Sequence, residues 1–230
     1  MYFITGTDTE IGKTFVTAAL TRAFASRGLR AAPIKSLAAG QDFVDGRWVN
    51  EDVATLVAAQ SLGLSDTQVG PLQFRAACAP HIAAALERRA IEREPLLSAI
   101  RATAALGDVA LVEGVGGFRV PLILPSPGDP AGWDTADLAA DLGLPVILVV
   151  GLRLGCINHA LLTAEAVRAR GLTLAAWVAN TVDPDLPHVA DNLAALQAGL
   201  NTPCLGHLPR LTDPLAAPAY LDISPLVASA

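Results

Sequence analysis

Lysine is nearly absent from this chain. Its 230 residues contain two lysines, Lys13 and Lys35, against fourteen arginines. The lysine ammonium is a compact charge on a flexible stem, whereas the guanidinium of arginine is planar, so the two cations suit different contacts with phosphate. A codon bias that spared two surface lysines would be the simplest explanation. The position of Lys13 inside a glycine-rich stretch favours a functional one.

Other absences exclude whole classes of protein. The three cysteines, Cys78, Cys156 and Cys204, are far apart and form no CxxC pattern, which disfavours a disulfide framework or a zinc site and fits a reducing compartment. The net charge of -6 disfavours a surface for nucleic acid or anionic lipid. The longest apolar run, residues 144–152, is too short to span a bilayer, and the first expected strand leaves no room for a signal peptide. We therefore expect a cytoplasmic protein that binds neither nucleic acid nor membrane.

Short runs typical of strands alternate with longer helical stretches along the chain. Several of the strands are apolar throughout, as in residues 146–150, which indicates burial on both faces of a sheet. The sequence therefore predicts a single α/β domain over residues 1–230, with a mostly parallel sheet and helices on both faces. We expect strands at residues 2–5, 30–34, 109–113, 146–150 and 173–180, and helices at 13–27, from about 51, and at 157–170. We expect loops at 36–50 and 121–130, and partial mobility at 211–230.

Residues 6–14 are the strongest candidate for a functional motif. They follow the first strand, open the first helix and end in Lys13 and Thr14. Backbone N–H groups of such a loop can converge on a phosphate, and the helix dipole favours the anion. We expect Lys13 to reach the β- and γ-phosphates of a nucleotide, although the two glycines enclose one residue more than usual. A strand-to-helix turn without a nucleotide is the alternative. The predicted nucleotide-binding residues are Gly6, Thr7, Asp8, Thr9, Glu10, Ile11, Gly12, Lys13 and Thr14.

Two carboxylates are candidates for a metal site. Glu113 ends an apolar strand and is followed by three glycines in four residues, and a buried carboxylate needs a cation or several donors. Asp52 lies at an expected helix start, where it could also simply complement the helix dipole. Magnesium commonly takes one or two carboxylates together with phosphate oxygens and water. We therefore expect Thr14, Asp52 and Glu113 to form a magnesium site.

Over most of its length the chain resembles dethiobiotin synthetases. The shared motifs are residues 6–14, Lys35 with Gly40, Pro-His-Ile at 80–82, Val-Glu-Gly-Val-Gly-Gly at 112–117, Leu-Gly-Cys-Ile-Asn-His-Ala at 154–160, and Trp-Val-Ala-Asn at 177–180. The resemblance implies a homodimeric P-loop enzyme of biotin synthesis that uses ATP, Mg²⁺ and CO2. Such an enzyme closes the ureido ring of 7,8-diaminopelargonic acid through a carbamate and a carbamic-phosphoric anhydride, and releases dethiobiotin, ADP and phosphate.

The resemblance also implies roles for single residues. Lys35, Lys13 and Thr9 would be catalytic, with Thr9 and Lys35 near the carbamate end of the substrate. The other substrate-binding residues would be Gly116 and Gly117 near the diamine, and Leu154, Gly155 and Asn158, which in this family hold the substrate carboxylate from the partner subunit. Besides residues 6–14, the nucleotide contacts would include Glu113, Gly116, Asn180, Leu205, His207 and Leu208. Without the resemblance, residues 154–158 read as an ordinary helix start and Asn180 as a turn former.

Two other kinds of protein share parts of this pattern. Nucleotide switches of the ParA and MinD type have a second lysine inside the phosphate loop, and residues 7–11 contain none. Relatives of cobyric acid synthases add a glutaminase domain, for which 230 residues leave no room. The chain departs from the dethiobiotin synthetase pattern at Ser36 and Ala39, where the family usually has proline and serine.

Overall fold

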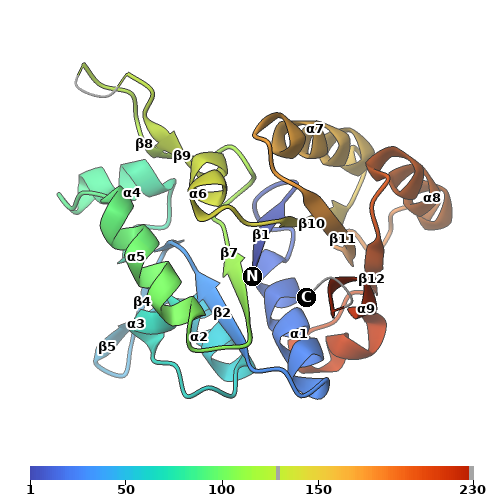
Figure 1. Ribbon diagram of the computed structural model, residues 1–230, viewed down its shortest axis with the longest axis horizontal. Coiled ribbons are helices and arrows are strands. Elements are labelled where there is room, and N and C mark those ends of the chain that lie inside the picture. Colours follow the sequence, from blue (N-terminus) through green and yellow to red (C-terminus); the bar gives the residue numbers. More distant parts are fainter. Residues whose placement is uncertain (128–129, 228–230) are drawn as a thin grey trace.

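The centre of the molecule is a parallel sheet. The computed structural model describes residues 1–127 and 130–227. Six strands lie in the order β12-β11-β10-β1-β7-β2, and every neighbouring pair is parallel (Figure 1). They are β1 (Tyr2–Gly6), β2 (Ala31–Lys35), β7 (Val109–Glu113), β10 (Val146–Leu152), β11 (Leu174–Thr181) and β12 (Cys204–Leu208). The predicted fold class is confirmed.

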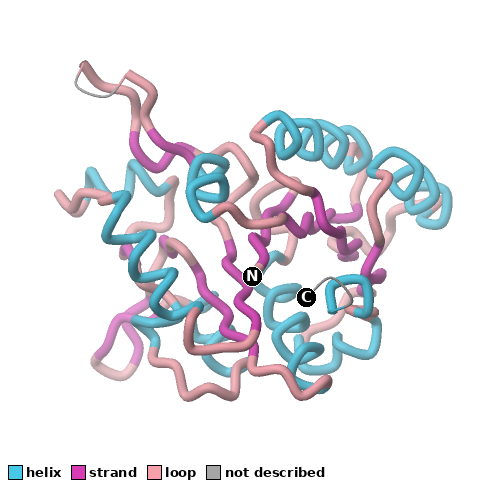
Figure 2. Tube along the Cα trace, viewed as in Figure 1, coloured by secondary structure: helices cyan, strands magenta, loops and turns pink. Residues whose placement is uncertain are grey.

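Helices surround this sheet (Figure 2). The helices are α1 (Lys13–Ser26), α2 (Glu51–Ala59), α3 (Asp66–Val69), α4 (Pro80–Leu86), α5 (Arg93–Ala104), α6 (Thr135–Leu142), α7 (Cys156–Ala169), α8 (Val189–Leu200), a 3-10 helix η1 (Pro214–Tyr220) and α9 (Ser224–Val227). The expected helices at 13–27, from 51 and at 157–170 correspond to α1, α2 and α7. Within residues 1–127 and 130–227, no helix combines the length and apolar character needed to cross a membrane.

Alternate side chains of each central strand enter two different cores. Leu148 belongs to a core on one face of the sheet that includes buried residues of α5, α6, α7 and α8, whereas Val149 belongs to the core on the other face, which includes residues of α1, η1 and α9. Phe3 and Ile4 divide between the same two cores. Burial on both faces explains why these strands are apolar at consecutive positions.

Two stretches that we expected to be loops contain strands, so those expectations were wrong. Residues 36–50 include β3 (Ala38–Ala39), which pairs with β6 (Gln73–Phe74), and a hairpin of β4 (Asp42–Val44) and β5 (Arg47–Val49). Its two-residue turn has positive φ at Asp45 and Gly46, a typical hairpin turn. Residues 121–130 include β8 (Pro121–Ile123), which pairs with β9 (Trp133–Asp134), while residues 128–129 lie outside the described residues.

The C-terminal stretch, residues 211–230, carries more structure than its weak pattern indicates. It contains η1 and α9, and residues 228–230 lie outside the described residues. Ala217 and Leu226 are buried against the face of the sheet that α1 covers. This segment therefore completes the second core.

Candidate active site

A cleft of about 880 Å³ opens at the carboxyl ends of β1, β2 and β7. Because these strands are parallel neighbours, with Lys35 beside Glu113 in the register, the segments that follow them meet at one edge of the sheet. Nine predicted site residues line the cleft: Thr9, Glu10, Gly12, Lys13, Thr14, Lys35, Asp52, Glu113 and Gly116. The sequence motifs thus converge in space.

The predicted phosphate loop, residues 6–14, connects β1 to α1. Gly12 precedes the helix with φ 82°, and a Cβ there would lie 2.3 Å from Nδ2 of Asn180, so only glycine fits. The Asn180 amide donates a hydrogen bond to the Ile11 carbonyl at 2.9 Å. The Lys13 ammonium folds back and donates to the Asp8 carbonyl at 2.8 Å. The first turn of α1 leaves its backbone N–H groups directed out of the helix, where an anion can bind.

Four side chains form a compact charged cluster beside this loop. The Lys35 ammonium lies 2.6 Å from Asp52 Oδ2 and 2.7 Å from Glu113 Oε1. The Thr14 hydroxyl donates to the same Glu113 oxygen at 2.7 Å. Glu113 is fully buried and the Lys35 side chain is 5% exposed. The ammonium therefore bridges the two carboxylates that we expected to bind metal.

The two lysines of the cleft are shifted in opposite directions. Desolvation by burial lowers the pKa of Lys13 to about 8, with Glu113 opposing the shift. Burial acts in the same sense on Lys35, but the charges of Glu113 and Asp52 outweigh it and raise the pKa of that lysine. At neutral pH both lysines carry a positive charge, and only Lys13 is close to losing it.

The cluster has the composition of a site that shares a magnesium ion with phosphate. Among the residues that the structure describes, there is no group of three or more His, Cys, Asp or Glu side chains that could hold a metal. The cluster instead offers two carboxylates and a hydroxyl. The second oxygen of Glu113, Oε2, is buried without a hydrogen-bond partner in the described structure. An unsatisfied carboxylate oxygen beside a phosphate loop suits magnesium, which completes its shell with phosphate oxygens and water.

Two supporting residues were missed by the sequence analysis. The N–H and hydroxyl of Ser36 both donate to the Glu113 carbonyl, at 3.0 and 2.8 Å, so the residue that departs from the family pattern fastens β2 to β7. Asn50 accepts a hydrogen bond from Val53 N at 3.0 Å and donates to Gly40 O at 2.6 Å. It caps α2 and thereby places Asp52. Asparagine directly before the start of a helix is a common N-cap, so the sequence alone could have identified Asn50.

Several predicted nucleotide contacts are not among the residues that line the cleft. The side chains of Leu205 and Leu208 are buried in the core, so only their backbone can reach a base. His207 Nε2 lies 2.8 Å from the Thr181 hydroxyl, and burial lowers the pKa of this histidine. Thr7 is held to the sheet by a hydrogen bond from its N–H to Val149 O at 3.0 Å. Their nucleotide contacts stay predictions.

The residues predicted to bind the substrate carboxylate are outside the cleft of this chain as described. Leu154 is 92% exposed, Gly155 precedes α7 with φ 92°, and Asn158 is exposed on its first turn. Gly117 lies next to the cleft-lining Gly116, near the carbonyl of Gly6. The start of α7 is therefore available to another molecule, and its predicted use in a dimer stays a prediction.

Comparison with known proteins identifies relatives along nearly the whole chain. A family model described as an AAA domain matches residues 1–217. The ATP-dependent dethiobiotin synthetase BioD of Janthinobacterium sp. (strain Marseille) is 50% identical over 228 residues, which cover 96% of this chain and 94% of that protein.

Solved structures of similar fold include a cell division protein complex and an ATPase. The MinC:MinD cell division protein complex of Aquifex aeolicus matches with a TM-score of 0.51 at 14% identity, covering 92% of this chain and 81% of the other. A ParA family ATPase from Chlorobium tepidum TLS matches with a TM-score of 0.50 at 13% identity, covering 100% and 93%. At such low identity the likeness shows a shared fold alone.

Proposed function

The chain belongs to the family of ATP-dependent dethiobiotin synthetases, and from this premise we propose how its cleft carries out the synthesis. The substrate is 7,8-diaminopelargonic acid, CO2 supplies the ureido carbon, and ADP and phosphate are released. The observation that carries the proposal is the Lys35 ammonium, held 2.6 and 2.7 Å from two carboxylates beside the phosphate loop. Lys35 thus offers a second cation to an anionic substrate, next to the loop that would bind the phosphates.

The phosphate loop binds ATP. Lys13 leaves the Asp8 carbonyl and pairs with the β- and γ-phosphates, which also accept hydrogen bonds from backbone N–H groups at the start of α1. Thr14, Asp52 and Glu113 would hold magnesium, which neutralises charge on the phosphates when bound. Lys35 then turns from the carboxylates into the cleft.

The reaction needs positioning and charge neutralisation more than covalent help from the protein. One substrate amine takes up CO2 and loses a proton to become a carbamate. A carbamate oxygen attacks the γ-phosphorus, ADP leaves, and the second amine attacks the resulting anhydride at carbon with loss of phosphate. Lys35 and Thr9 lie at the carbamate end, where the ammonium offsets charge shared by the carbamate and the transferring phosphoryl group.

The far end of the substrate requires a second copy of the chain. Gly116 and Gly117 admit the diamine close to the loop backbone, and the substrate carboxylate binds at the start of α7 in the partner subunit, at Leu154, Gly155 and Asn158. The 92% exposure of Leu154, which is not among the residues that line the cleft, supports this assignment. A homodimer is thus part of the proposal.

Phosphate release from Mg-ATP, with and without the diamine, tests the function. With ¹³C-bicarbonate present, we expect phosphate to appear only when the diamine is added, together with dethiobiotin that carries one ¹³C atom by mass spectrometry. Hydrolysis that does not depend on the diamine would instead favour a nucleotide switch. Phosphate release without the labelled product would indicate a different acceptor.

A further inference from the structure

The loop that follows β7 needs an outside support. Residues 114–120 form neither helix nor strand, and three of them are glycines, which lose the most conformational freedom on folding. Yet Val115, Gly116 and Val120 line the cleft. Gly116 has φ 62°, and a Cβ there would lie 2.9 Å from Val120 Cγ2 and 3.5 Å from the Thr9 hydroxyl. The loop therefore has to keep one conformation against the phosphate loop.

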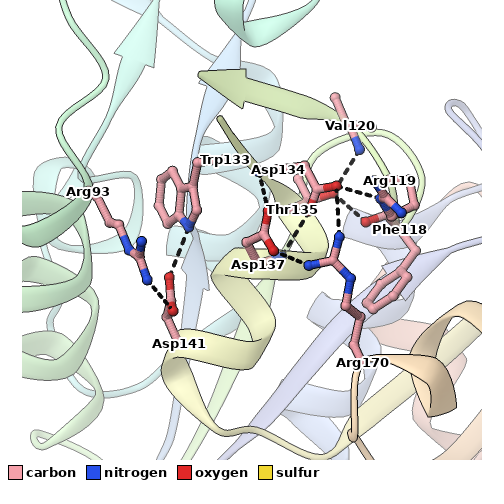
Figure 3. Close-up of polar contacts among 10 residues, drawn as sticks. All are labelled: Arg93, Phe118, Arg119, Val120, Trp133, Asp134, Thr135, Asp137, Asp141 and Arg170. Carbon is pink, nitrogen blue, oxygen red and sulfur yellow. Dashed lines mark hydrogen bonds and ion pairs between the residues drawn. The ribbon is translucent and has the colours of Figure 1, made fainter. Parts of the chain in front are cut away.

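Thr135, the first residue of α6, supplies that support (Figure 3). Its hydroxyl donates to the Phe118 carbonyl at 2.6 Å, with the Gly117 carbonyl at 3.3 Å, and accepts a hydrogen bond from Val120 N at 3.0 Å. Its own N–H donates to the Val120 carbonyl at 3.0 Å. Thr135 is fully buried, so water cannot replace these contacts. One side chain thus fixes the backbone on the C-terminal side of Gly116.

The position of Thr135 is itself fixed by charged groups. Asp134 caps α6 in a capping box with Asp137. The Asp134 carboxylate pairs with Arg119 of the loop, and its Oδ2 lies 3.5 Å from Arg170, which ends α7 and also pairs with Asp137 (Figure 3). The loop, α6 and α7 are therefore tied together around one helix start.

We propose that Thr135 is a positioning residue for the substrate diamine, acting through the backbone of residues 116–120. This inference rests on the proposed function, which places the diamine beside Gly116 and Gly117. Most of the predicted nucleotide contacts, Lys13 among them, lie on the phosphate loop, which Thr135 does not touch; within residues 116–120 only Gly116 is also a predicted nucleotide contact. Loss of the hydroxyl should consequently affect the two substrates differently.

Thr135→Val tests this proposal, because valine keeps the shape and removes the hydroxyl. The change removes the hydrogen-bond partner of the buried Phe118 carbonyl and that of the half-buried Val120 N–H. We expect the KM for the diamine to rise by at least about fivefold, a factor typical of one unpaired buried polar group, while the KM for ATP stays within about twofold. Thr135→Ser retains the hydroxyl and should restore the diamine KM.

Thr103→Val is the matched control. Thr103 is also a buried threonine whose hydroxyl donates to a backbone carbonyl, that of Gln68 at 3.2 Å, but it lies on α5 away from the cleft lining. It should alter stability without altering either KM. Three outcomes would overturn the proposal. Thr135→Val could change both KM values equally or leave the KM for the diamine unchanged, or Thr135→Ser could fail to restore that KM.

Amide hydrogen exchange adds a readout that does not need the reaction. Peptides over residues 114–122 should exchange faster in Thr135→Val than in the wild type or Thr103→Val, and unchanged protection would contradict the inference. If Thr135→Val does not fold, Asp134→Ser keeps a capping side chain, removes the pairs with Arg119 and Arg170, and should show the same diamine effect. A wild type that makes no dethiobiotin would sink the proposed function, whereas unchanged kinetics and exchange in an active variant would sink only the role of Thr135.

Discussion

The bridge from Lys35 to two carboxylates can be measured by a double-mutant cycle. Lys35→Met leaves the fully buried Glu113 with only the Thr14 hydroxyl as a donor in the described structure. Removing one partner of a buried ion pair costs about 3–5 kcal/mol of unfolding free energy. Glu113→Gln should cost less, because Asp52 still pairs with the ammonium at 2.6 Å and its side chain is 44% exposed.

Urea unfolding at pH 7, without nucleotide or metal, gives these free energies. At a typical urea dependence of about 2 kcal/mol per molar, Lys35→Met should lower the midpoint by about 1.5–2.5 M. The double variant should lose less than the sum of the two single variants, by about 1–3 kcal/mol. Additive losses would show that Lys35 and Glu113 do not interact in the folded chain, and would refute the geometry from which the site is built.

Magnesium provides the second half of the same test. In the wild type the ammonium lies between the two carboxylates that would hold the metal and neutralises their charge, so metal and ammonium compete. Magnesium alone should therefore raise the unfolding midpoint of Lys35→Met more than that of the wild type. The double variant with Glu113→Gln is the control and should respond least. An equal response of all three proteins would remove Glu113 from the metal site.

Three further predictions concern Lys13, Asn180 and Gly206. Burial lowers the pKa of Lys13 to about 8, and phosphate binding needs the charged form of this lysine. At constant ionic strength, the affinity for ATP should therefore be constant below pH 8 and fall by up to about tenfold per pH unit above it. An affinity that stays constant well above pH 8 would contradict this. Asn180→Ala should weaken binding of ATP by about tenfold and of inorganic tripolyphosphate by less; equal losses would mean that Asn180 acts on the phosphate loop, through its hydrogen bond to Ile11, and not on the base. Gly206→Ala should destabilise the chain far more than Gly28→Ala. Both glycines have positive φ, but only at Gly206 would an added Cβ lie 2.0 Å from a backbone oxygen, that of Tyr220. Similar unfolding midpoints of the two variants would refute the clash.

The sequence predicted five of the six strands of the central sheet, all but β12, because burial on two faces leaves a visible trace. Residues 146–150 are apolar at every position, and the strand sends Leu148 and Val149 into opposite cores. The hairpin of β4 and β5 was missed although it has a local signal. Asp45-Gly46 is a common two-residue hairpin turn, but the exposed strands beside it lack an apolar alternation. Turn chemistry would have found it where periodicity did not.

The part of the candidate site that could be predicted from the sequence is the part at the ends of the strands. Lys35 and Glu113 are the last residues of β2 and β7, and parallel neighbours bring their ends together without further information. The ammonium bridge could not be derived from spacing, because Asp52 comes from a helix whose start depends on the Asn50 cap. Thr135 left no signal at all. Its contacts join residues 15–18 positions apart, on either side of the segment that contains β8 and β9.

The structure explains why lysine, which is scarce in this chain, is used at positions 13 and 35. At Lys35 the space between Asp52, Glu113 and Thr14 accepts a single nitrogen with donors in three directions, at 2.6, 2.7 and 3.5 Å. A planar guanidinium would need a wider opening and could not turn from the carboxylates into the cleft without moving the strand ends. At Lys13 the same compact group reaches back to its own loop in the absence of a phosphate. Under the proposed function both lysines change partners during the reaction, which a flexible ammonium can do more readily than a planar guanidinium.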